Sequence, residues 1–245
     1  MIVITAFYLL DGPGRAESPS VVAYGRNTDF HRYGAALWST GMKYEYHFRP
    51  IGDKRRVFCI HRSPLRIVLP SPAAIGDFVW TWYNECIVTE RVLSLFERAG
   101  FSGFIADRTE IARFKRRSKG THEVPPLFEI LVYGEGGPPD AQSGSEPLTQ
   151  SNETGDRQYS SYKNGLIVNE KAWDGSDFFT LEGWRRHTIV SDRVKELIVA
   201  EGLSNCLLLP VEGLRWWTNL LTPEEELRRR QAREEGLDLG GTRPP

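Results

Sequence analysis

The sequence lacks most of the features that would place it in a specialised class of protein. Only three of its 245 residues are cysteine, which excludes a scaffold held together by disulfide bonds. No apolar run approaches the ~20 residues that a membrane-spanning helix requires. Neither sign of charge is in excess, because 31 basic side chains accompany 32 acidic ones, and this argues against a dedicated nucleic-acid-binding protein. Apolar residues make up 40% of the chain, which is enough for an ordinary globular core.

The apolar run at residues 1–10 has two interpretations, a secretion signal or a first β-strand. It lacks the basic flank and the small-residue cleavage site of a signal, and the Asp-Gly-Pro-Gly sequence at 11–14 is typical of a turn that ends a strand. We therefore predict a strand. Cys59, Cys86 and Cys206 are scattered among apolar neighbours, which favours buried thiols in a reducing compartment. We expect a cytoplasmic protein.

An internal repeat is the strongest pattern in the chain. Residues 87–104 and 189–206 align without a gap at an offset of 102 residues. Upstream, the pair Asp-Phe occurs at 77–78 and again at 177–178. The identical positions include Ile87/Ile189, Val88/Val190, Arg91/Arg193, Val92/Val194, Leu95/Leu197, Gly100/Gly202 and Ser102/Ser204.

Each copy of the repeat predicts a strand, a helix and a second strand. Thr89 and Ser191 are good N-cap residues, and apolar residues follow them at helical spacing. Gly100 and Gly202 stand where a left-handed C-terminal cap belongs. Further strands are predicted at 43–49, 56–61, 66–69, 127–133 and 165–168. The predicted fold class is α+β, with internally duplicated strand–helix–strand units packed on a mostly antiparallel sheet, plus a charged C-terminal helix.

The composition along the chain suggests four parts. Residues 134–160 are rich in Gly, Pro, Ser and acidic residues, so we predict a flexible loop there. It would separate an N-terminal half, residues 1–133, from a C-terminal half, residues 161–212. Residues 213–245 carry an apolar docking stripe and then a charged helix that begins at Thr222 and has favourable i,i+4 pairs of Glu and Arg.

Few residues form a recognisable chemical motif. His47, Cys59 and His61 could be imagined as metal ligands, but no fourth ligand stands at a familiar spacing, so separate structural roles are the better interpretation. No nucleophile–base motif is found, and we predict that the protein is not an enzyme. The basic runs at 54–66 and 113–119 could form a phosphate-binding surface, although solvated turns balanced by acids elsewhere are the simpler interpretation.

Tryptophans flank both copies of the repeat, at Trp80, Trp82 and Trp184. For any one of them a place in the core is the simpler interpretation, because an aromatic ring buries a large area. A protein-binding surface is the functional alternative, since Trp, Tyr and Arg are the usual residues of binding hot spots.

Two sequence strings resemble a known family. The string WDGSDFF at 173–179, followed by IVSDRV at 189–194, resembles the C-terminal signature of the double-CXXCG motif family. Its members are bacterial paralogues grouped with the immunity proteins of polymorphic and contact-exchanged toxin systems. The segments DFVW at 77–80 and VTERV at 88–92 resemble the equivalent N-terminal part. The similarity extends over residues 60–212.

The sequence departs from this family at its cysteines. Where the second CXXCG motif should fall, Ser151 and Thr154 occupy the cysteine positions and Gly155 is retained; the first motif is absent. Hydroxyls are poor substitutes for thiolate ligands, so we predict a protein without a metal or other cofactor.

The resemblance implies an immunity protein that binds a cognate toxin and neutralises it by stoichiometric occlusion. The alternative is a nucleic-acid-associated regulator that uses the two basic runs. Acidic side chains of the predicted loop would face a basic toxin, together with the three tryptophans. These acidic residues are Glu135, Asp140, Glu146, Glu153 and Asp156.

Overall fold

The computed structural model shows a mostly-β protein with two short α-helices. It describes residues 6–12, 36–72, 75–81, 83–116, 123–151, 157–159, 162 and 164–214. The predicted docking stripe and charged C-terminal helix, as well as Trp82, Glu153 and Asp156, lie outside these residues. The predicted α+β class overestimates the helical part, because the two α-helices of the described residues have nine residues each while the β-strands contain several times as many.

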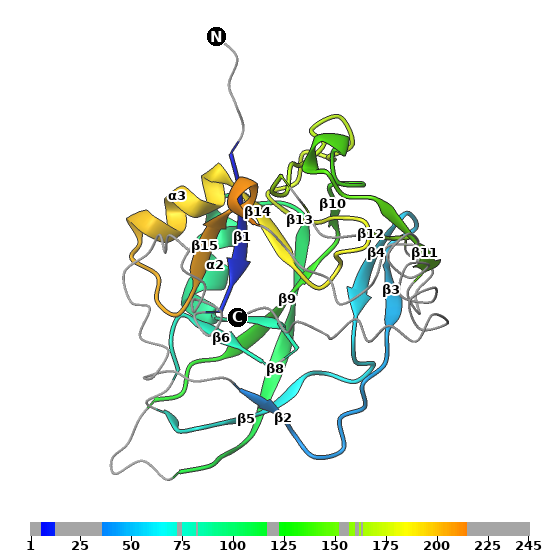
Figure 1. Cartoon of the computed structure of the whole chain (residues 1–245). Helices are drawn as coiled ribbons and strands as arrows, with labels where there is room; N and C mark the ends of the chain where they lie inside the picture. Colours follow the sequence, from blue (N-terminus) through cyan, green and yellow to red (C-terminus); the bar gives the residue numbers. More distant parts are fainter. Residues whose placement is uncertain are drawn as a thin grey trace, which may run out of the picture.

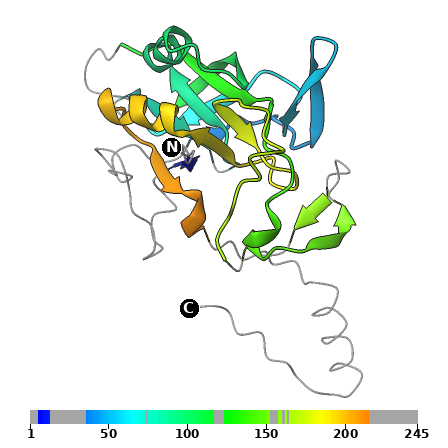
Figure 2. The same cartoon turned by 90° about the horizontal axis from the view of Figure 1, so that it is seen from above.

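The strands form two larger sheets and two small hairpins (Figure 1). The larger sheet has the order β2-β5-β8-β9-β7-β6, and its strands are β2 (Leu37–Trp38), β5 (Arg66–Leu69), β8 (Phe104–Phe114), β9 (Leu127–Val132), β7 (Cys86–Thr89) and β6 (Phe78–Trp80). The second sheet has the order β10-β13-β14-β1-β15, and its strands are β10 (Gly134–Glu135), β13 (Phe178–Thr180), β14 (Thr188–Ser191), β1 (Phe7–Asp11) and β15 (Leu207–Pro210). The hairpins are β3 (His47–Ile51) with β4 (Arg55–Cys59), and β11 (Pro147–Ser151) with β12 (Arg157–Tyr159). Figure 2 shows both hairpins at the margin of the molecule, away from the two helices.

The two sheets contain the same four-stranded unit. In the first unit the order is β6-β7-β9-β8, and helix α2 (Glu90–Arg98) connects β7 to β8. In the second unit the order is β13-β14-β1-β15, and helix α3 (Asp192–Ala200) connects β14 to β15. The predicted strand–helix–strand pattern is therefore present in both copies, with an additional strand before each one.

The N-terminal strand β1 completes the second unit, where it takes the place that β9 has in the first. In the first unit, Ile130 of β9 pairs with Cys86 and Ala106. In the second unit, Leu10 of β1 pairs with Thr188 and Leu208, the positions 102 residues further along the chain. Figure 1 shows β1 between β14 and β15. Because the first strand belongs to the last unit, the predicted division into halves at residues 134–160 does not describe the packing.

The main hydrophobic core lies between the two units and is built from equivalent residues of both. It includes Val92 and Phe96 of α2 and Val194 and Ile198 of α3, each side chain at most 1% exposed. Equivalent strand residues join them, such as Phe78 with Phe178 and Val88 with Val190. The two sheets thus bury their apolar faces against each other and against the two helices.

The segment predicted as a flexible loop forms local structure over most of its length. Gly134–Glu135 pairs in parallel with β13 as strand β10, residues 141–143 form a 3₁₀ turn named η3 (Ala141–Ser143), and β11 follows. Backbone hydrogen bonds to Thr180 and Ile167 connect it to the second unit. Conversely, residues 165–168, which were predicted to form a strand, do not form one. They make only one isolated bridge, between Val168 and Pro139.

The helices begin and end where the sequence predicted, but the N-cap side chains do not form the expected capping hydrogen bonds. Gly100 and Gly202 have φ of +66° and +59°, as a left-handed cap requires. Thr89 and Ser191 are the N-cap residues, but neither hydroxyl bonds to its own helix. The hydroxyl of Ser191 donates to Asp177 instead. The Ser191 hydroxyl therefore connects two segments rather than closing its helix, whereas the Thr89 hydroxyl has no hydrogen-bond partner among the described residues.

A close backbone approach between the units predicts a strong effect for one glycine. Gly103 has φ of +94°, and a Cβ placed there would lie 1.9 Å from the carbonyl oxygen of Phe178. We expect Gly103→Ala to lower the free energy of unfolding by several kcal/mol, on the order of 3, since backbone must move. Gly100→Ala is the control: it also has positive φ but open space around it, so its cost is about 1 kcal/mol. Equal losses in urea unfolding would contradict the proposed clash.

Candidate functional site

The carboxylate of Asp177 connects the two units. It lies just before β13 in the second unit, and its side chain is 7% exposed. It accepts hydrogen bonds from the backbone N–H of Ser102 at 3.1 Å and from the Ser102 hydroxyl at 3.3 Å, both in the first unit. Within its own unit it accepts from the Ser191 hydroxyl at 2.9 Å and from Arg193 at 3.0 Å. Arg193 also donates to the carbonyl of Ala99, at the end of α2.

Asp77 makes the reciprocal connection in the opposite direction. It accepts from the backbone N–H and the hydroxyl of Ser204, each at 2.8 Å, in the second unit. Arg91 of its own unit donates to it at 2.8 Å and reaches the carbonyl of Glu201 at the end of α3. Each unit therefore supplies one Asp–Arg pair that holds the serine of the other.

These contacts assign the residues shared by the two copies to the scaffold. Sequence reasoning proposed structural roles for Arg91, Arg193, Thr89 and Ser191, and it noted the two identical serines. It did not foresee that each serine binds the aspartate of the opposite copy. The repeat could have indicated these contacts. Polar residues that are identical in both copies and partly buried are expected to form equivalent hydrogen bonds in each copy.

The structure corrects the predicted role of two tryptophans. Trp80 is 6% exposed, and its indole N–H donates to the carbonyl of Asn205 at 2.8 Å. Trp184 is 7% exposed and packs edge-on against Tyr162. Both lie in hydrophobic clusters, where their large rings fill the core and bury a large apolar area. Neither side chain is presented to a partner in this structure.

The acidic residues of 134–160 that are described have local roles. Glu135 is half exposed and lies 3.8 Å from Arg185. Asp140 precedes the 3₁₀ turn η3, where its carboxylate accepts from the backbone N–H of Gln142 at 2.8 Å. Glu146 is exposed. These positions are compatible with solvent-facing charge but do not define a site.

A buried polar cluster lies where β4, β7 and β9 meet. His61 Nε2 lies 3.0 Å from a carboxylate oxygen of Glu129, and its Nδ1 lies 2.6 Å from the carbonyl of Ser63. Glu85 stands beside them and accepts from the Thr81 hydroxyl. Glu85, Glu129 and His61 are each at most 7% exposed. Two buried carboxylates with one imidazole form the most concentrated ionisable group in the described part of the chain.

The pKa values of this cluster are shifted by burial and by mutual charge. Burial, and then the charge of Glu129, raise the pKa of Glu85 to about 7. For His61, burial opposes the charged form, but the hydrogen bond and charge of Glu129 outweigh it and raise the pKa. Burial likewise raises the pKa of the Cys59 thiol to about 11. The other two cysteines are also buried with raised pKa values, which makes all three thiols poor nucleophiles at neutral pH.

His47, Cys59 and His61 have separate surroundings. His47 and Cys59 are register partners in the β3–β4 hairpin, while His61 is engaged by Glu129 and Ser63. Within the described ranges no group of three or more His, Cys, Asp or Glu side chains is placed to hold a metal ion. Ser151 ends strand β11, and Thr154 lies outside the described residues.

An exposed aromatic cluster covers the polar cluster. Trp38 lies with its ring centroid 4.5 Å from Tyr83, 6.2 Å from Tyr44 and 5.8 Å from His61. Tyr44 and Tyr83 are 5.1 Å apart and are 43% and 37% exposed. The Tyr44 hydroxyl donates to that of Tyr46. We call Trp38, Tyr44, Tyr46 and Tyr83 the aromatic patch.

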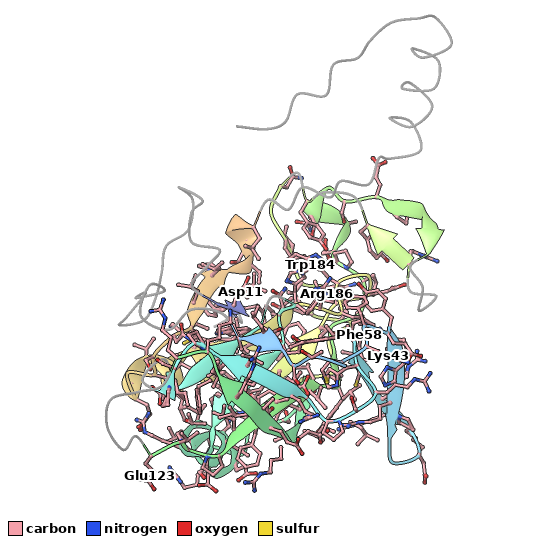
Figure 3. All side chains as sticks on the ribbon, turned by 90° about the horizontal axis from the view of Figure 1, so that it is seen from below. Asp11, Lys43, Phe58, Glu123, Trp184 and Arg186 are labelled. Carbon is pink, nitrogen blue, oxygen red and sulfur yellow. The ribbon has the colours of Figure 1, made fainter. Side chains whose placement is uncertain are left out.

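Cationic side chains surround the aromatic patch. Arg186 donates to the carbonyl of Tyr83 at 3.2 Å. Burial and the hydrogen bond with Tyr46 raise the pKa of Tyr44, although the positive charge of nearby Arg186 opposes the shift. Lys43 precedes Tyr44 and is exposed, and Figure 3 shows Lys43, Phe58 and Arg186 on the same side of the molecule. Sequence reasoning missed this site because its residues come from three separate segments.

Among the described residues, the two basic runs adjoin only where β5, which contains Arg66, pairs with β8, which contains Arg113. Lys54, Arg55 and Arg56 belong to the β3–β4 hairpin, whereas Arg113 lies in β8 beside β5. Arg66 is paired with Glu110 at 3.1 Å, which reduces the local positive charge. Residues 117–119 lie outside the described part of the chain.

Comparison with known proteins gives no identification. The sequence matches no protein-family model, and no curated protein matches it significantly. Over the residues described, no helix is both long enough and apolar enough to cross a membrane.

Proposed function

We propose that this protein is an immunity protein that neutralises one cognate toxin by binding to it and occluding it, without catalysis. The proposal rests on the resemblance of the strings at 173–179 and 189–194, and of their N-terminal counterparts, to the double-CXXCG motif family. It supposes a cytoplasmic protein that acts without a metal cofactor.

The contacts of the signature residues support this proposal in one respect. Asp177, Arg193, Asp77 and Arg91 hold the two units together, so the similar residues describe a common scaffold. A scaffold of this kind leaves recognition to side chains outside the signature, which can differ from one toxin to another. The aromatic patch and the β3–β4 hairpin are such exposed regions.

Co-expression with the product of the neighbouring reading frame tests the proposal. We expect that product alone to arrest growth and this chain to restore growth, with a one-to-one complex on gel filtration. Asp177→Ala, which should disrupt the scaffold, is expected to abolish protection, whereas Asp192→Ala on the exposed side of α3 should retain it. A harmless neighbour, or growth arrest that this chain does not relieve, would refute the proposal.

A nucleic-acid-associated regulator is the second candidate. One observation favours it: Lys54, Arg55 and Arg56 lie together on the exposed turn and strand of the hairpin, and none of them forms an ion pair with a described residue. Binding to nucleic acid through these cations would weaken steeply with salt, in proportion to the number of phosphates contacted.

A further inference from the structure

We propose that the aromatic patch and its two neighbouring cations, Lys43 and Arg186, form the docking surface for an acidic, carboxylate-bearing segment of the partner protein. This inference names the chemistry of the partner and rests on the proposed function for the identity of that partner as a toxin. The acidic segment at 134–160 suggested a basic partner surface, whereas this docking surface requires an acidic one.

The exposed aromatic rings are the first argument. Tyr44 and Tyr83 are two of only four large apolar or aromatic side chains that are more than a third exposed among the described residues. They come from positions 39 residues apart in the sequence, yet they touch each other and share Trp38 beneath them. A half-buried Trp supporting two exposed Tyr rings beside an Arg has the composition of a protein-binding hot spot.

The hydrogen-bonding groups are the second argument. The polar groups at the patch include the tyrosine hydroxyls, the exposed Lys43 ammonium and the half-buried Arg186 guanidinium, which is held by the carbonyl of Tyr83. All of these can donate hydrogen bonds, and the two cations can only donate. Glu45, the nearby exposed acid, is already bound by Arg62 at 2.7 Å. Neither Lys43 nor Arg186 forms an ion pair within the described part of the chain. A partner that supplies carboxylates satisfies this surface, whereas a basic one would be repelled.

The ring geometry favours a protein over a nucleic acid. Single-stranded nucleic acids stack their bases on open aromatic faces along a basic track. Here Trp38, Tyr44 and Tyr83 pack against one another in a single cluster, tilted at 33–49°, rather than standing separately along a basic track. The hydrogen-bond donors and aromatic rings of the patch are suited to bind carboxylates and apolar side chains of a protein.

Fluorescence anisotropy with defined probes tests the surface independently of the toxin. The probes are labelled decaglutamate, decalysine and an oligothymidylate of similar length, titrated with the purified full-length protein. We expect decaglutamate to bind and decalysine not to bind. Lys43→Glu and Tyr83→Ala are each expected to weaken the binding of decaglutamate by about tenfold or more.

Matched variants control for total charge and for apolar area. Lys115→Glu makes the same charge change away from the patch, in the basic run at 113–119, and Val199→Ala removes an exposed apolar side chain from α3. Both should alter decaglutamate binding by less than about twofold. Absence of decaglutamate binding, or equal losses in the controls, would overturn the proposal. Tighter binding of the oligothymidylate that is lost in Lys43→Glu would also overturn it, in favour of a nucleic acid.

The same variants separate this inference from the proposed function. If the neighbouring product is toxic and is neutralised, Lys43→Glu should reduce protection and Lys115→Glu should not. Full protection by Lys43→Glu would refute the docking surface and leave the immunity function standing. Decaglutamate binding at this surface together with a harmless neighbour would refute the immunity function and leave the acidic-partner surface standing.

Discussion

Asp177→Ala is expected to lower the free energy of unfolding by about 2–3 kcal/mol, because it removes a buried carboxylate with several charge-assisted hydrogen bonds, while the Arg193 side chain, 62% exposed, keeps its hydration. The carboxylate accepts from a backbone N–H, two hydroxyls and a guanidinium, and its side chain is 7% exposed. Its removal leaves the N–H and hydroxyl of Ser102 without their acceptor at the boundary between the units. Chemical denaturation followed by tryptophan fluorescence measures the loss.

Two further variants establish the cause of that loss. Asp177→Asn keeps the shape and one acceptor oxygen but not the charge, so its cost should lie between those of Asp177→Ala and the native protein. Asp192→Ala removes a carboxylate that is 41% exposed, is paired with Lys195 at 3.1 Å and also contacts Tyr8, and it should cost no more than about 1 kcal/mol. If Asp177→Ala costs as little as Asp192→Ala, the cross-unit contacts do not stabilise the protein.

The local elements could be predicted because the repeat encodes them twice. The helices begin after Thr89 and Ser191 and end before Gly100 and Gly202, where the sequence places capping residues. The completion of the second unit by β1 could not be predicted from these local signals. Its pairing with β14 joins residues that are about 180 positions apart in the chain, and only the register shows that Leu10 is the counterpart of Ile130.

The candidate site was less predictable than the fold. The tryptophans were considered because of their size, but size favours burial equally, and Trp80 and Trp184 are in the core. The aromatic patch consists of one residue from strand β2, two from the segment before β3 and one from the turn between β6 and β7. None of these segments has a motif of its own. Their meeting is a consequence of tertiary packing, which one sequence without its fold does not reveal.

The buried carboxylate of Glu85 predicts a protein that becomes less stable as the pH rises. Its folded-state pKa is about 7, above the ordinary value of 4.5, so the folded protein keeps a proton that the unfolded chain loses. Stability from this group is fully present below pH 4.5 and is lost as the pH rises to about 7. A difference of this size corresponds to about 3 kcal/mol. The raised pKa of His61 gives a change in the same direction, lost as the pH passes its folded-state pKa.

Glu85→Gln isolates this contribution. The amide resembles the protonated carboxyl in shape and has no charge to bury, so the variant should match the native protein near pH 5 and exceed its free energy of unfolding by up to about 3 kcal/mol at pH 8. The variant should still lose a smaller amount of stability as the pH rises, because His61 also titrates. Glu97→Gln, on the exposed face of α2, should change stability by less than about 0.5 kcal/mol at both pH values. Urea unfolding at pH 5 and pH 8 makes the comparison, and a variant whose pH dependence equals that of the native protein would show that Glu85 does not titrate in this range.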